Sequence, residues 1–269
     1  MRVTSRPSRS GRATGPRLAL GAIAIVLPLA AAAELSNDSM LGAGLRSRPA
    51  YDGADARHTE IVPVIRYLGE PWFLRSTQGV LEGGLHTALA SGLHLGTQLA
   101  YEAGRQSSES RFLQDRHLGT IARGASLGLQ LEWDQAFGPV PTTWLARTRS
   151  NTDRGLGTQA DLRLSAGVFQ HAGFGAGVFA QATWADAKAT RAYHGVDAAA
   201  AAASGLPVFR PGSGWLSTSL GLLWSVDLGR QWIVVGSLEA RRLRGDAAHS
   251  PLTQSRSNPA ASAGLAYRY

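Results

Sequence analysis

The sequence predicts an all-β fold: a transmembrane, antiparallel, up-and-down β-barrel of about twelve strands, with ten as the alternative count. First, the C-terminal stretch alternates apolar with small or polar residues from Pro259 to the final aromatic Tyr269. Second, the same period of two recurs along the chain. Third, the connections between these segments are alternately short and long. An apolar wall facing lipid, closed by pairing the last strand with the first, requires these features.

The composition fits one large β-domain and excludes several classes of site. The chain has 269 residues, of which 32 are glycine and 44% are hydrophobic. Its lack of cysteine excludes a disulfide scaffold, a thiolate metal site and a thiol nucleophile. After Glu34 no apolar run approaches about 18 residues, so we expect no membrane-spanning helix.

The first 33 residues have the pattern of a cleaved secretory signal peptide. Five arginines without an acidic residue precede an apolar run over residues 18–33, which ends in Ala31, Ala32 and Ala33. A retained membrane anchor is the alternative, but this run is short for a span. Cleavage leaves residues 34–269 as the barrel domain, with 22 basic against 19 acidic residues. This small excess gives no support to nucleic-acid binding.

Twelve segments show the alternation and set the order of the expected strands. The sixth is among the clearest, and the seventh is short. Pro63 weakens the second, because proline cannot donate to a ladder. In chain order the segments are residues 39–47, 59–68, 72–77, 79–89, 92–101, 125–133, 142–148, 161–168, 174–181, 216–228, 232–243 and 259–269. Representative residues expected to face lipid are Leu41, Leu45, Ile61, Tyr67, Leu95, Leu99, Leu127, Leu129, Leu131, Leu162, Val178, Leu216, Leu220, Leu238 and Leu265.

The lengths of the connections predict the orientation of the barrel. Residues 69–71, 90–91, 134–141, 170–172 and 229–231 form the short connections. Residues 48–58, 102–118, 149–156, 185–214 and 244–258 form the long ones. Outer-membrane barrels have short periplasmic turns and long external loops, so both termini are expected in the periplasm. The tight connection between the third and fourth segments breaks the rule. A secreted sandwich would alternate too, but its outer face would not lack charges so completely.

Aromatic and basic residues near the strand ends predict contact with the membrane surface. The aromatics expected in the interfacial girdles are Tyr67, Tyr101, Trp133, Trp184, Trp224, Trp232 and Tyr269. Arg123 and Arg242 fall in the outward phase near the external ends. They either extend toward lipid headgroups or contact the phosphates of lipopolysaccharide.

Charged residues in the inward phase predict a polar lumen. They include Arg46, Arg66, Arg75, Glu82, Glu132, Asp161, Arg163, Glu239 and Arg241. Such charges either line a water-filled pore or pair across the lumen and block it. His86 and His94 are expected near Glu82, but no serine elbow or paired-carboxylate motif accompanies them. We therefore expect no catalytic, cofactor or metal site.

The longest loop carries a short helix. Asp197 can cap its N-terminus, an alanine run follows, and Gly205 can end the helix in left-handed geometry before Pro207. We expect this helix to fold over the barrel mouth.

Three loop motifs and the terminal Tyr-Arg-Tyr resemble the MipA/OmpV family (MltA-interacting protein). The motif residues are Tyr51, Gly53, Tyr193, Gly195, Val196, Ser204, Gly205, Leu206, Pro207, Arg210, Pro211, Gly212, Arg242, Gly245, Asp246, Ser250 and Pro251. Arg244 and His249 depart from the family pattern, which more often has an aliphatic and an acidic residue there. The resemblance implies an outer-membrane protein.

The resemblance also implies a function: a non-enzymatic scaffold that links a murein (peptidoglycan) transglycosylase to a murein synthase. A porin-like channel for small solutes and a surface adhesin are the alternatives, and an enzyme is a further one. The expected partners are outer-membrane lipid and lipopolysaccharide, the murein enzymes, and the barrel-assembly machinery through the C-terminal strand.

Overall fold

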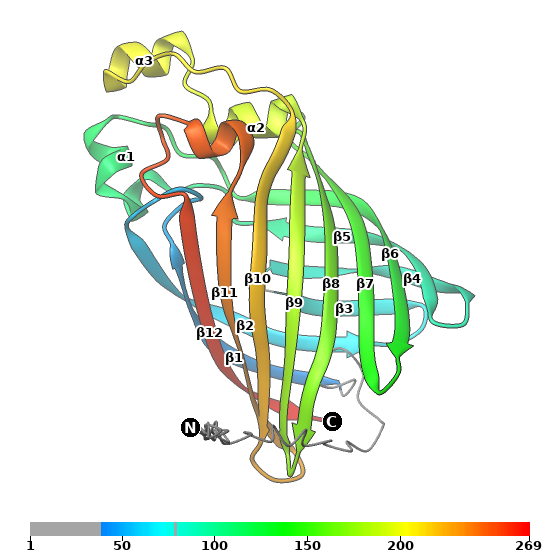
Figure 1. Cartoon of the computed structure of the whole chain (residues 1–269). Coiled ribbons are helices and arrows are strands. Elements are labelled where there is room, and N and C mark those ends of the chain that lie inside the picture. Colours follow the sequence, from blue (N-terminus) through cyan, green and yellow to red (C-terminus); the bar gives the residue numbers. More distant parts are fainter. Residues whose placement is uncertain (1–38, 78–79) are drawn as a thin grey trace, which may run out of the picture.

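The computed structural model describes residues 39–77 and 80–269, so the expected signal peptide lies outside the described residues. Twelve antiparallel strands form a closed barrel in which each strand pairs with its neighbours in sequence and β1 pairs with β12 (Figure 1). The predicted fold class is confirmed, and the strand count is twelve rather than ten.

The strands closely follow the predicted segments. They are β1 Met40–Pro49, β2 Arg57–Leu68, β3 Trp72–Thr77, β4 Val80–Ala90, β5 Leu93–Glu102, β6 Gly124–Phe137, β7 Val140–Asn151, β8 Thr158–His171, β9 Phe174–Ala185, β10 Gly214–Asp227, β11 Trp232–Leu243 and β12 Ser257–Arg268. The largest difference is at residues 134–141, expected as a turn, where β6 and β7 continue as a hairpin and pair up to Phe137 and Val140.

Pairing of β1 with β12 closes the wall. The register runs from Met40 opposite Arg268 to Ser47 opposite Ala261, and the backbone N–H of Tyr269 donates to the carbonyl of Ser39. Gly44 lies opposite Gly264, where a Cβ on Gly44 would lie 2.6 Å from the carbonyl oxygen of Ala263. This seam therefore depends on the absence of side chains where the two strands approach.

The two ends of the barrel differ. We call the end with the short turns and the C-terminus the turn end, and the end with the helices the loop end (Figure 1). At the loop end lie α1 Arg111–Asp115, α2 Ala187–His194, α3 Ala198–Ser204 and two 3-10 turns, Ser107–Glu109 and Gly245–His249. No helix among the described residues has the length and apolar character needed to cross a membrane.

The outer face of the wall is apolar, as the alternation predicts. In β6, Leu127 and Leu129 are each 58% exposed, while Ser126 and Gln130 face inward and are buried. Leu216 is an exception, because a bulge between Trp215 and Ser217 reverses the phase there. Trp215 is consequently exposed and Leu216 buried, contrary to its predicted outward direction. Exposed aromatics lie at both ends of the wall. Trp224, expected to face outward, is partly buried because its ring lies over Gly236.

The wall is incomplete beside the short β3–β4 hairpin. β3 pairs with β2 only through Arg66–Leu68, and the hairpin ends where Thr77 pairs with Val80. Ser76 Oγ accepts from the backbone N–H of Ile65, but no strand pairs with residues 57–64 of β2 on this side within the described chain. Pro63 lies on this free edge, where a missing N–H costs no ladder bond. The connection that broke the length rule therefore leaves an opening in the loop-end half of the wall.

Candidate functional site

Buried ion pairs cross the lumen and divide it. Glu82 in β4, 1% exposed, accepts from Arg75 Nε at 2.7 Å and from Arg147 Nη1 at 2.8 Å. Since β3 and β7 lie on opposite sides of the β4–β6 segment of the wall, the carboxylate joins strands that are not neighbours. Removing such charges from water is costly, so each must be closely compensated. We call the set Arg75, Glu82, Arg147 and Asp161 the charge layer.

The charge layer continues to adjacent strands through further charged groups. Arg147 Nε donates to Asp161 Oδ2 at 2.9 Å, and Thr183 Oγ1 donates to Asp161 Oδ1 at 2.8 Å. Arg75 Nη1 donates to Glu132 Oε2 at 3.0 Å. Arg149, two residues after Arg147 on the same face of β7, pairs with both Asp161 and Glu102 at 3.2 Å. Strands β3 to β8 are thus tied together from inside.

Cavities lie on both sides of the charge layer and beside it. The loop-end cavity, of about 710 Å³, has Arg147 and Asp161 in its floor. The turn-end cavity, of about 570 Å³, is lined by Arg75 and Glu132. A smaller cavity of about 180 Å³ lies beside the layer, against β1 and β10–β12. Glu82 lines none of them, so it lies in the layer that separates the two large cavities.

The structure places all nine charges of the predicted lumen set inside the barrel. Arg46, Asp161, Glu239 and Arg241 line the loop-end cavity, Arg66, Arg75 and Glu132 line the turn-end cavity, Glu82 is in the layer, and Arg163 lines the small cavity. The guanidinium of Arg163 lies 4.0 Å from the centre of the Phe179 ring. Arg241 pairs with Asp52 at 2.9 Å, which ties the wall to the first long loop.

Sequence reasoning missed Arg147 and Arg149, which hold the charge layer on the β7 side. Arg147 lies in the short seventh segment, to which no phase was assigned, and Arg149 lies in the connection expected at residues 149–156. The available signal was that Thr143, Leu145 and Arg147 share one phase, and the structure shows all three buried. A continuous register from the clear sixth segment across the hairpin would have placed them inward.

The two lumen histidines lie apart from Glu82. Their rings stack edge to face at 5.7 Å and line the turn-end cavity, and His86 Nε2 lies 2.7 Å from the carbonyl oxygen of Gly69. Glu82 is held by the two arginines instead. No cluster of three or more His, Asp or Glu suited to a metal ion occurs in the part of the chain that the structure describes.

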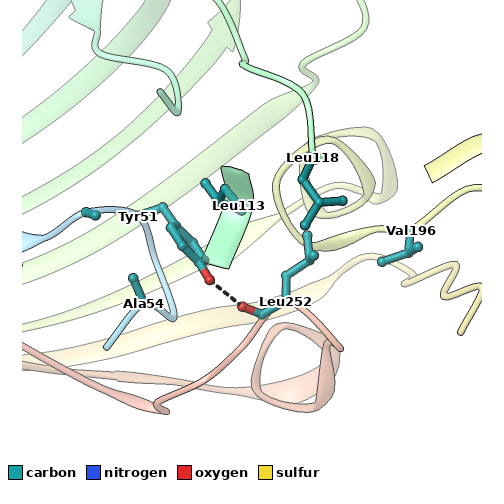
Figure 2. Close-up of a cluster of buried hydrophobic side chains, with 7 residues drawn as sticks. Tyr51, Ala54, Leu113, Leu118, Val196 and Leu252 are labelled. Carbon is teal, nitrogen blue, oxygen red and sulfur yellow. Dashed lines mark hydrogen bonds between the residues drawn. The ribbon is translucent and has the colours of Figure 1, made fainter. Parts of the chain in front are cut away.

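Four loops at the loop end share a hydrophobic core above the mouth, which we call the cap. It consists of Ala50, Tyr51, Ala54, Leu113, Leu118, Val196 and Leu252, with Leu206 and Phe209 packed against it (Figure 2). Tyr51 Oη donates to the carbonyl of Leu252 at 2.9 Å, which joins the first long loop to the last (Figure 2). Burial raises the pKa of Tyr51, so its hydroxyl remains a donor.

Most family-motif residues lie in the loops that form the cap, and several hold these loops together. Asp197 caps α3 by accepting from Ala200 N, and Gly205 ends the helix with φ 70°, as predicted. Gly53 has φ 102°, which favours glycine, and its N–H donates to Asn258 Oδ1. Ser250 Oγ donates to the carbonyl of His194, and Gly212 N–H donates to Asp246 Oδ2.

The remaining motif residues have more local positions. Gly195 ends α2, Gly245 has φ 48°, Ser204 Oγ bonds the carbonyl of Ala200, and Pro211 is fully buried. Tyr193 accepts from Arg105 through its carbonyl, while burial raises the pKa of its phenol to about 12. Pro207, Arg210 and Arg242 are exposed, and Pro251 is half-buried. Arg123, predicted to face outward, lines the loop-end cavity at its rim.

Acidification is expected to loosen the cap through His194. Its ring is 1% exposed, and burial lowers its pKa from 6.5 to about 4. The folded state therefore binds fewer protons than the unfolded state between these values, so stability falls as pH falls through this window. We expect His194 to contribute roughly 3 kcal/mol of loss between pH 7 and 4, from about 1.4 kcal/mol per pKa unit.

The measurement compares denaturant unfolding of the wild type and His194→Leu in detergent at the two pH values. The leucine variant should lose less stability on acidification by that amount. His249→Gln, a change at an exposed histidine, should behave as the wild type. Equal acid sensitivity of wild type and His194→Leu would refute the assignment.

Comparisons with known proteins give a family match and several similar solved structures. The family model described as "MltA-interacting protein MipA" matches residues 41–269. A comparison with curated proteins found no match. Among solved structures, the NanC porin covers 86% of this chain and 100% of its own, at 9% identity and a TM-score of 0.47. LpxR from Salmonella typhimurium covers 86% and 100%, at 9% identity and 0.49. An outer membrane channel from Pseudomonas putida F1 covers 91% and 97%, at 10% identity and 0.47.

Proposed function

Because this chain belongs to the MipA family, whose model matches residues 41–269, we propose that this outer-membrane β-barrel is a non-enzymatic scaffold for murein enzymes. The family description names an interaction with MltA. In the proposal, the turn end faces the periplasm and binds a murein transglycosylase and a murein synthase. The wall contacts lipid, and Arg242 contacts lipopolysaccharide phosphates. The barrel-assembly machinery recognises the C-terminal strand β12.

The charge layer is the observation that most supports a scaffold. A solute channel needs a continuous aqueous path, whereas Glu82 and its two arginine partners occupy the lumen between the large cavities. Cross-linking of six strands by these charges also stiffens the wall. A rigid, blocked barrel is suited to anchoring partners at a membrane.

The turn end offers two features for a partner. The β6–β7 hairpin carries Phe137, 60% exposed, next to the turn at residues 138–139. The turn-end cavity lies beside it and is lined by His94, Glu132 and Asp134. An aromatic next to a polar recess is a common anchor in protein interfaces. Because the turns are short, we expect a small and transient interface.

Site-specific photo-crosslinking in intact envelopes tests the scaffold. A photoreactive residue replaces Pro139 at the hairpin tip, and the matched control carries it at Ala202 on α3, exposed at the loop end. We expect Pro139 to crosslink to a murein hydrolase or synthase and Ala202 to crosslink to neither. Recovery of no murein enzyme from Pro139, or of the same enzyme from Ala202, would count against the proposal.

A small-solute channel is the second candidate, favoured by the small cavity. This cavity shares Val62 and Thr77 with the loop-end cavity and Arg66 and Arg75 with the turn-end cavity. A shift of Arg75 away from Glu82 would join the three spaces. In that case Arg163→Glu, which reverses a charge in the small cavity, should change ion selectivity.

A further inference from the structure

The wall beside the opening presents apolar side chains outward. Ile61, on the free edge of β2, is 79% exposed, and its partner in β1, Leu45, is 58% exposed. Thr77 and Val80, the last paired residues of the described part of β3 and β4, border the opening on one side. Glu109 bridges above it, within 3.7 Å of both Arg48 and His58.

The opening leads into the loop-end cavity. Val62, Pro63, Leu81 and Tyr101 around the opening all line this cavity of about 710 Å³. These side chains are apolar or aromatic, whereas the cavity behind them is lined by charged and polar groups. An apolar entrance that joins lipid to a polar chamber matches the division of an amphiphile into tail and head.

Six buried polar atoms on residues that line the cavity have no hydrogen-bond partner among the described residues. They are Arg105 Nε, Arg149 Nε, Gln181 Oε1, Asn258 Nδ2 and the two ring nitrogens of His194. Buried polar atoms are nearly always hydrogen-bonded, so several unpartnered atoms around one cavity indicate a ligand there. Three of them, Arg105 Nε, Arg149 Nε and Asn258 Nδ2, can only donate, and a neutral His194 adds one more N–H, so donors outnumber acceptors and favour a ligand rich in acceptor oxygens.

Arg105 supplies the charge that selects the ligand. It is 8% exposed, and its Nη atoms donate to the carbonyls of Tyr193 at 2.9 Å and Gly119 at 3.4 Å. No carboxylate lies within ion-pair distance of it in the described ranges, unlike Arg46, Arg48, Arg147, Arg149 and Arg241 in the same cavity. Burial lowers its pKa, a cost that a bound anion would offset.

We propose that the loop-end cavity is a binding site for an anionic amphiphile of the surrounding leaflet, which enters between β2 and the β3–β4 hairpin. Its phosphate or carboxylate head binds Arg105, with Asn258 and His194 as further partners. Its acyl tail lies in the opening against Val62, Leu81 and Tyr101. The site is in the loop-end half of the barrel, so it does not depend on the scaffold role.

Native mass spectrometry of the full chain in dodecyl maltoside tests the site. Dodecyl phosphate is titrated against dodecanol, which lacks the charge, and against inorganic phosphate, which lacks the tail. We expect retained adducts of dodecyl phosphate only. Arg105→Gln should weaken them by about tenfold or more, the loss of a charge-assisted hydrogen bond, and Arg105→Lys should retain part of the binding.

Two further variants test the entrance. Val62→Trp should fill the opening and lower dodecyl phosphate binding about tenfold, whereas Leu220→Trp, on the lipid face of β10, should leave it unchanged. Arg116→Gln, a cap arginine outside the cavity that also bonds a backbone carbonyl, controls for loss of cap structure. A difference in electrophoretic mobility between unboiled and boiled samples of each variant reports that the barrel is folded. Unchanged binding in folded Arg105→Gln, or equal binding of inorganic phosphate, would overturn the proposal.

Discussion

Glu82→Gln is expected to lower the free energy of unfolding by about 3–5 kcal/mol, because it leaves two buried guanidinium groups without their shared carboxylate. Glutamine keeps the volume and one acceptor oxygen, so packing is preserved and the charge alone is removed. Urea unfolding of the protein refolded in lipid vesicles, followed by tryptophan fluorescence, measures the loss.

Glu132→Gln is the matched control for this change. Its carboxylate binds the same Arg75, at 3.0 Å, but its side chain is 19% exposed at the turn-end cavity and holds a single cation. Water can replace part of that interaction, so we expect a loss below about 1 kcal/mol. Equal losses in the two variants would mean that Glu82 has no special role in the charge layer.

Leu129→Arg is expected to destabilise the barrel by about 2–4 kcal/mol in lipid, because it places a charge in the apolar wall near the middle of β6. Phe137→Arg is the matched control, on the same strand and with similar exposure, but at the turn end. There an arginine reaches the headgroups, and the expected cost is about 0–1 kcal/mol.

The same vesicle unfolding assay measures both arginine variants. A cost that depends on position along β6 indicates a wall that spans the bilayer. Equal and small costs at the two positions would contradict the assignment of the exposed leucines to a lipid-facing surface.

Regular alternation made most of the wall predictable from sequence. A period of two fixes which side chains of β6 meet lipid, and closure in lipid demands that β12 pair with β1. The bulge before Ser217 could not be predicted, because one extra residue reverses the phase without any mark in composition. The opening beside the short β3–β4 hairpin could not be predicted either, because it depends on which residues of β2 pair with β3.

The interior was predictable as a list of charges but not as a network. Arg75 and Glu82 are seven residues apart and were both placed inward, but their link to Arg147 depends on a distance of 2.8 Å across the lumen. Side-chain reach between non-neighbouring strands leaves no periodic signal. The helix α3 shows the opposite case. Its two ends could be predicted from Asp197 and Gly205 alone, because local hydrogen bonding determines where a helix begins and ends.

The central claim is that the charge layer makes this barrel a blocked anchor rather than a pore. Single-channel recording of the purified protein in planar bilayers tests it most directly. We predict no steps above the protein-free baseline, either for the wild type or for Arg163→Glu. A steady conductance from the wild type, with ion selectivity altered by Arg163→Glu, would contradict the claim.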